Sequence, residues 1–143
     1  MELTNKTVLI TGSSRGIGAA TALAFAKAGS RVILNARHEL PASLKQQLDE
    51  LGTEYCFLPG DVSDEHVVKE LTKTAWEKFG GIDVLINNAG ITRDRLLIGM
   101  KTADFDEVLQ VNLKGPFLMI QALLKKMYKQ RAGVIINLAS VVG

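Results

Sequence analysis

The residues with the clearest chemical potential form a glycine-rich stretch near the N-terminus, at positions 11–18, which read TGSSRGIG. The glycines follow the spacing Gly-x-x-x-Gly-x-Gly, directly after a short apolar run and at the start of a helix-like segment. Glycine is needed where such a turn bends tightly and where its backbone approaches a pyrophosphate, which the free N–H groups of the helix start then face. The stretch predicts a nucleotide phosphate site, although glycines at a strand-to-helix turn can also be merely structural.

Two arginines indicate which nucleotide would bind. Arg15 lies at the helix start, where a cation opposes the helix dipole at a cost of about 0.3–1 kcal/mol that a bound phosphate would offset. Positions 35–37, after the second apolar run, read NAR and lack the acid that normally holds the ribose 2′-hydroxyl of NAD. Arg37 could instead pair with a 2′-phosphate, so the sequence predicts NADP(H) as cofactor. The alternatives are a salt bridge elsewhere for Arg15 and a solvated surface position for Arg37.

The elements that must position these residues alternate regularly along the chain. We expect strands at 8–10, 32–34, 55–58, 84–86 and 134–138, separated by helices that begin near 16, 41, 64 and 102. The strands are short and apolar on both faces, which is typical of a parallel sheet covered by helices on both sides. The prediction is an α/β fold, a Rossmann-type doubly wound parallel sheet forming one domain over 1–143, with its ligand at the carboxyl ends of the strands.

Helical spacing also predicts which side chains each helix buries. The expected buried stripe of the first helix is Ile17, Ala20, Ala24 and Ala28. That of the third is Val67, Leu71, Ala75 and Phe79, behind an N-cap at Ser63. The last helix is expected to run from 102 to 130 with a kink at Gly115-Pro116. Cys56, in an apolar run, is expected to be a small core residue.

The composition excludes several classes of protein. With 143 residues, 47% hydrophobic residues and a net charge of +2, the chain can build one core but has no overall charge that favours nucleic acid. No apolar run is long enough for a membrane span. One cysteine allows no internal disulfide, so we expect a cytoplasmic protein. His38 and His66 have no ligand partners at metal-binding spacing, so no metal is expected.

Three further stretches complete a recognisable set. These are DV at 61–62, NNAG at 87–90 and VNLKG at 111–115. Together with the glycine loop, they make the whole chain resemble the short-chain dehydrogenase/reductase family. The resemblance implies that the cofactor phosphates lie against Gly12, Ser14, Arg15, Gly16, Ile17 and Gly18. It further implies adenine contacts at Asp61 and Val62, contacts to the ribose and nicotinamide side at Asn88, Ala89 and Gly90, and bracing of the central strands by Asn87 through Thr11.

The resemblance also implies two catalytic residues. Ser140 would hold the substrate carbonyl oxygen as charge develops on it, and Asn112 would hold a proton-relay water. Taken alone, such a serine is a turn former and such an asparagine only bends a helix. The family's general acid is a tyrosine followed four residues later by a lysine, and neither Tyr55 nor Tyr128 has that lysine. We therefore expect an N-terminal part of a longer enzyme, incomplete at the C-terminal side of the sheet and inactive alone.

Within the family, positions 91–97, 111–115 and 139–143 are most similar to reductases of 3-oxoacyl groups carried on acyl carrier protein. The implied reaction is NADPH-dependent reduction of a 3-oxoacyl thioester in fatty-acid synthesis, by a full-length protein that is a homo-oligomer, a tetramer. A basic cluster at a helix end comprises Lys125, Lys126, Lys129 and Arg131. Arg131 matches a carrier-docking position; the alternative is a solvated helix terminus. Reduction of acetoacetyl-CoA or another ketone, a nucleotide-binding module without catalysis, and a purely structural fragment are the alternative functions.

Overall fold

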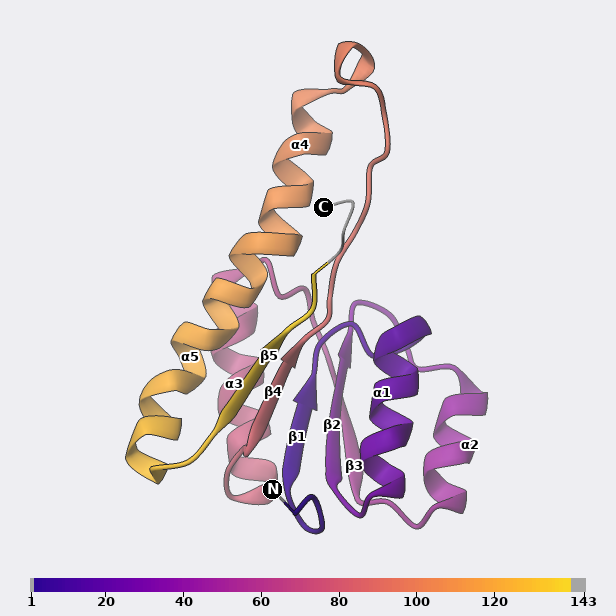
Figure 1. The fold of residues 1–143 in the computed structure, drawn as a ribbon, viewed down its shortest axis with the longest axis vertical. Coiled ribbons are helices and arrows are strands. Elements are labelled where there is room, and N and C mark those ends of the chain that lie inside the picture. Colours follow the sequence, from indigo (N-terminus) through magenta and orange to yellow (C-terminus); the bar gives the residue numbers. More distant parts are fainter. Residues whose placement is uncertain (1, 140–143) are drawn as a thin grey trace.

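The computed structural model describes residues 2–139, which form a five-stranded parallel sheet in the order β3-β2-β1-β4-β5 (Figure 1). The strands are β1 (Thr7–Ile10), β2 (Arg31–Ala36), β3 (Tyr55–Pro59), β4 (Val84–Asn87) and β5 (Val134–Asn137). The chain starts in the centre, moves outward through β2 and β3, and then returns to β4 on the other side of β1. This reversal brings the carboxyl ends of β1 and β4 together, as expected for a site at the switch point of a doubly wound sheet.

Helices cover both faces of the sheet, which confirms the predicted architecture. The α-helices are α1 (Gly16–Lys27), α2 (Ala42–Glu50), α3 (Glu65–Phe79), α4 (Thr102–Leu109) and α5 (Gly115–Gln130). α1 and α2 pack on one face, and α3 and α5 pack on the other (Figure 1). None of the helices in residues 2–139 is long and apolar enough to span a membrane.

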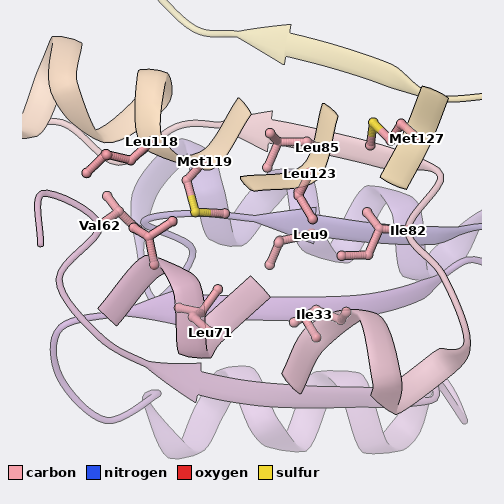
Figure 2. Close-up of a cluster of buried hydrophobic side chains, with 12 residues drawn as sticks. Leu9, Ile33, Val62, Leu71, Ile82, Leu85, Leu118, Met119, Leu123 and Met127 are labelled. Carbon is pink, nitrogen blue, oxygen red and sulfur yellow. The ribbon is translucent and has the colours of Figure 1, made fainter. Parts of the chain in front are cut away.

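The strands are mostly apolar on both sides because each contributes to two separate cores. In β1, Val8 and Ile10 pack under α1 and α2, whereas Leu9 packs under α3 and α5. Figure 2 shows the second core, where Leu9, Leu85 and Leu123 lie between the sheet and the two helices. Cys56, expected as a small core residue, is half-buried and packs against this core, and its burial raises the pKa of the thiol.

The helix faces differ from the sequence predictions. α1 buries Gly18, Ala22 and Ala26, and Ile17 is 71% exposed. The small side chains at i, i+4 and i+8 let this helix lie close to the sheet, and an alanine-rich helix gives little apolar contrast from which to predict its buried face. α3 buries Val68, Leu71, Thr72 and Ala75, so the predicted stripe was about one position off at its start.

The N-cap of α3 is Asp64, not Ser63 as predicted. Asp64 Oδ1 accepts hydrogen bonds from the backbone N–H groups of His66 at 2.9 Å and Val67 at 3.2 Å. The Ser63 hydroxyl instead donates to Asp61 Oδ1 at 2.7 Å. Because Asp61 engages the serine, the adjacent aspartate satisfies the free donors of the helix start.

The predicted single helix over 102–130 is interrupted by a π-helical turn at Gln110–Lys114, between α4 and α5. Pro116, at the start of α5, has no N–H to donate to the carbonyl of Asn112 four residues earlier. A wider turn relieves that mismatch, and such turns often mark functional sites. α4 and the loop before it project beyond the carboxyl ends of the strands (Figure 1).

Candidate functional site

A cleft of about 590 Å³ lies at the carboxyl ends of β1, β2, β3 and β4. The polypeptide segments that follow these four strands all contribute to its walls. The cleft brings together every predicted cofactor residue except Ile17 and Gly18, namely Gly12, Ser14, Arg15, Gly16, Arg37, Asp61, Val62, Asn88, Ala89 and Gly90. Residues that are far apart in the sequence are therefore assembled where a doubly wound sheet binds its ligand.

The glycine loop requires its glycines for packing as well as for access to a ligand. Gly12 has φ +61°, and a Cβ atom there would lie 2.7 Å from the Cα atom of Ala89. A Cβ atom on Gly18 would collide with the carbonyl oxygen of Gly12. Gly18 therefore lets α1 approach the loop, whereas Ile17 is exposed and does not line the cleft. Ile17 and Gly18 are not brought to the cleft wall as the resemblance implied.

The turn after β4 is fixed to the glycine loop by Asn88 and Thr11. The Thr11 hydroxyl oxygen accepts from the N–H groups of Asn88 at 3.1 Å and Ala89 at 3.0 Å, and Asn88 Nδ2 donates to the Gly12 carbonyl at 2.8 Å. The expected partnership of Asn87 with Thr11 is wrong. Asn87 Nδ2 donates instead to Asn137 Oδ1 at 2.8 Å, because these residues end β4 and β5 in register.

Arg15 and Arg37 are exposed at the cleft, at the start of α1 and directly after β2. Within residues 2–139, no carboxylate lies within 4.0 Å of either guanidinium group, so the salt-bridge alternative for Arg15 has no partner there. Glu39, on the same rim, is paired with Lys45 at 3.6 Å. Among the described residues, the cleft thus has two arginines without an acidic partner, and both charges can meet an anion.

The adenine end of the predicted site lies in the loop after β3. Asp61 Oδ1 accepts from both the backbone N–H and the hydroxyl of Ser63, at 2.9 and 2.7 Å, which fixes the carboxylate at the cleft wall. Val62 is buried and gives this part of the wall an apolar surface. A fixed acceptor beside an apolar surface suits a flat, partly polar base.

Asn112 lies in the π-helical turn and holds the segment after Gly90. Its Oδ1 accepts from the N–H of Ile91 and its Nδ2 donates to the carbonyl of Ile91, both at 2.8 Å. The side-chain amide is therefore engaged with the backbone of a residue that lines the cleft. Ser140 lies outside the described residues, so the arrangement of the two predicted catalytic residues relative to each other remains an expectation.

Sequence reasoning missed two polar residues beside the cleft, Ser13 and Asn35, which are both almost completely buried. Asn35 also lines the cleft. The available signal was an asparagine within an otherwise apolar strand, because a buried amide must find hydrogen-bond partners. Among residues 2–139, no cluster of three or more His, Cys, Asp or Glu side chains could hold a metal ion.

Arg131 lies at the opposite end of the sheet from the cleft, in the connection from α5 to β5. Its backbone is left-handed, with φ 59°, and ends α5. It lines a second hollow of about 560 Å³ together with Leu124, Tyr128 and Ile135. The side chain of Lys126, in the same basic cluster, lies over the ring of Trp76 at 5.4 Å.

Residues 6–143 match the family model described as short chain dehydrogenase. The 3-oxoacyl-[acyl-carrier-protein] reductase FabG of Thermotoga maritima is 46% identical over 150 residues, covering 100% of this chain and 58% of that protein. A 3-oxoacyl-[acyl-carrier-protein] reductase of Synechocystis sp. is 45% identical, covering 99% of this chain and 58% of that protein. The chain therefore spans 58% of the length of these curated relatives.

Solved structures of short-chain dehydrogenases and oxidoreductases are also similar to this chain. A protein described as a short-chain alcohol dehydrogenase from Sinorhizobium meliloti superposes with a TM-score of 0.93 at 36% identity, covering 99% of this chain and 58% of the other. A metagenomic short-chain oxidoreductase in complex with NADP superposes with a TM-score of 0.92 at 34% identity, covering 99% and 65%. The residues that match the family model include every residue of the cleft.

Proposed function

The chain belongs to the short chain dehydrogenase family, and from that membership we propose that its cleft binds NADP(H) for the reduction of a ketone. The observation that carries the proposal is that Arg15, at the glycine loop, and Arg37, directly after β2, both line the cleft. Neither guanidinium group has a carboxylate within 4.0 Å in residues 2–139. The NADP complex of a similar oxidoreductase supports the same cofactor.

The residues fit that cofactor. Gly12 lets the loop pack against Ala89 with no side chain between them. The backbone N–H groups at the helix start would then face the phosphates. Arg15 and Arg37 would hold the 2′-phosphate, and Asp61 with Val62 would hold the adenine. When bound, the cofactor supplies the hydride. Asn88, Ala89 and Gly90 would line the ribose and nicotinamide side. Ser14 and Gly16 complete the phosphate loop, Gly18 supports the loop from α1, and Ile17 is exposed beside it.

We propose that the substrate is a 3-oxoacyl thioester carried on acyl carrier protein, because the similar curated proteins are named as reductases of that group. Ser140 would donate a hydrogen bond to the ketone oxygen as negative charge develops there. The Asn112 side chain is engaged with Ile91. Its backbone carbonyl, to which Pro116 cannot donate, would therefore accept the hydrogen bond of the proton-relay water.

The test is reduction of an acetoacetyl thioester on carrier protein by the full-length protein, followed by the loss of NADPH absorbance. We expect turnover with the full-length protein and none with residues 1–143 alone, which contain no Tyr-x-x-x-Lys sequence. A positioned general acid contributes about 10²–10⁴ in rate. Turnover by residues 1–143 alone would contradict the assignment of the catalytic groups. NADPH binding by the full-length protein without reduction would favour a nucleotide-binding module.

We further propose that the full-length protein is a cytoplasmic homo-oligomer, a tetramer. The support is a row of exposed apolar side chains along α4, the π-helical turn and α5, comprising Phe105, Leu109, Leu113, Phe117, Leu124 and Tyr128. Large exposed apolar patches commonly mark surfaces that are covered by another protein.

Arg131 provides a test of carrier-protein binding. Replacing Arg131 with glutamate should lower kcat/KM for the carrier-linked substrate about tenfold or more, because it places like charges opposite each other in an acidic partner's interface. Activity on a small acetoacetyl thioester should be unchanged. Arg131→Gly removes the charge at a left-handed position that glycine favours, so it should not destabilise the fold. Equal loss of both activities in the two variants would show that Arg131 does not act in docking.

A further inference from the structure

A buried pair of polar residues joins the loops on the adenosine side of the cleft. Ser13 is 0% exposed and Asn35 is 1% exposed. The Ser13 backbone N–H donates to the Asn35 carbonyl at 2.8 Å, and the Asn35 N–H donates to the Ser13 hydroxyl oxygen at 2.9 Å. The same hydroxyl donates to the carbonyl of Ile10, the last residue of β1, at 2.8 Å. The glycine loop is therefore bonded to the end of β2 by backbone and side chain together.

The Asn35 side chain extends this connection to a third loop. Its Nδ2 atom donates to the carbonyl oxygens of Leu58 at 3.0 Å and Gly60 at 3.2 Å. The Gly60 N–H in turn donates to the carbonyl of Ala36 at 3.0 Å. One buried amide thus fixes the end of β3 against the end of β2, while the backbone of the same residue fixes the glycine loop.

Each arm of this network ends just before a charged residue of the cleft. Ser13 lies two residues before Arg15, Asn35 two residues before Arg37, and Gly60 directly before Asp61. We propose that Ser13 and Asn35 are positioning residues that set these three side chains relative to one another, and that they thereby determine selectivity for the nucleotide 2′-phosphate. This inference rests on the proposed binding of NADP(H).

The physical reason is that no ion pair in the described part of the chain holds either arginine side chain in position. Both are exposed, and neither has a carboxylate within 4.0 Å in the described part of the chain. A guanidinium binds phosphate well only when its planar set of donors is held in a suitable orientation, so the origin of each flexible side chain matters. Burying an amide and a hydroxyl beside an apolar core is unfavourable unless these groups form hydrogen bonds. The Ser13 hydroxyl and the Asn35 Nδ2 atom are bonded in this way, at the place where the cleft needs rigidity.

The experiment compares two probes by titration calorimetry on the full-length protein. Adenosine 2′,5′-bisphosphate carries the 2′-phosphate and 5′-AMP lacks it, so the ratio of their dissociation constants isolates 2′-phosphate recognition. Asn35→Ala should reduce this ratio about tenfold, because it removes both hydrogen bonds of Nδ2 and each neutral hydrogen bond contributes roughly a few-fold. Ser13→Ala removes the bonds of the hydroxyl group but keeps the bond from the Ser13 N–H to the Asn35 carbonyl, so it should reduce the ratio only about threefold, on the scale of a neutral hydrogen bond.

Matched controls lie at the other end of the sheet. Ser30 is also buried and its hydroxyl donates to the Leu3 carbonyl at 2.7 Å. Gln130 Nε2, like Asn35 Nδ2, donates to two backbone carbonyls, those of Ile82 and Ala132. Ser30→Ala should lower thermal stability to a similar extent as Ser13→Ala, and Gln130→Ala should lower it less than Asn35→Ala because Gln130 is exposed. Both control variants should leave the ratio as in the wild type.

The outcomes separate the two proposals. If the wild type binds both probes equally, the proposed NADP(H) preference fails. If the wild type is selective and both test variants keep its ratio, Ser13 and Asn35 are only structural and the inference is overturned. Thermal unfolding is measured for every variant, and if Asn35→Ala does not fold, the ratio of Ser13→Ala decides.

Discussion

Replacing Arg37 with aspartate should reverse the nucleotide preference of the full-length protein from NADPH to NADH. Arg15 and Arg37 line the same cleft. A hydrogen bond to a charged group contributes about 1.5–3 kcal/mol, so two such bonds favour the 2′-phosphate by roughly two orders of magnitude or more. Aspartate at position 37 would repel that phosphate and would restore the carboxylate that normally holds a free 2′-hydroxyl.

Dissociation constants for NADPH and NADH, measured by quenching of protein fluorescence, provide the check. Arg15→Ala should weaken NADPH binding and leave NADH binding nearly unchanged. Lys27→Asp makes the same charge reversal as Arg37→Asp at the far end of α1 and should alter neither constant by more than about twofold, because exposed charges further apart than about 10 Å are screened. Equal affinity of the wild type for the two nucleotides would refute the assignment of both arginines.

The fold could be predicted because local patterns and global architecture agree. Each strand is short and apolar on both faces, and Leu9 and Val8 do pack into different cores as such a strand requires. The buried face of α1 could not be predicted in the same way. Its alanines are spread around the helix, so the close approach of Gly18, Ala22 and Ala26 to the sheet depends on tertiary packing rather than on hydrophobic contrast.

The residues that line the cleft could be predicted from the sequence where several consecutive residues form one segment of its wall. The glycine loop and the segment after β4 are contiguous in sequence, and strand order alone brings their backbones together. The hydrogen-bond partners of single polar residues were not predictable. Asn87 bonds to Asn137 and Asn112 to Ile91 because of strand register and a π-helical turn. An isolated asparagine in sequence gives no information on which distant group its amide will meet.

Replacing Gly18 with alanine should abolish nucleotide binding and destabilise the fold, although alanine favours a helix by about 1 kcal/mol over glycine. A Cβ atom at this position would collide with the carbonyl oxygen of Gly12 and would lie 2.9 Å from the Cα atom of Ser13. Both atoms belong to the backbone of the phosphate loop, so neither can move without displacing the loop. Overpacking of this kind typically costs about 1–3 kcal/mol, and a displacement of about 1 Å in a positioned group can reduce function about a hundredfold.

Two other glycines separate the contributions to that effect. Gly16 has φ +59° and no protein atom within 4 Å of the place that a Cβ atom would take, so Gly16→Ala adds backbone strain of about 1–2 kcal/mol without a clash in the protein free of nucleotide. Gly99 has open space and no left-handed backbone, so Gly99→Ala should leave thermal unfolding and NADPH titration unchanged. If Gly18→Ala bound NADPH as tightly as Gly99→Ala, the contact of α1 with Gly12 would not hold the phosphate loop in place. Loss of binding in Gly18→Ala beyond that in Gly16→Ala would identify the close approach of the helix, rather than loop conformation alone, as the requirement for this site.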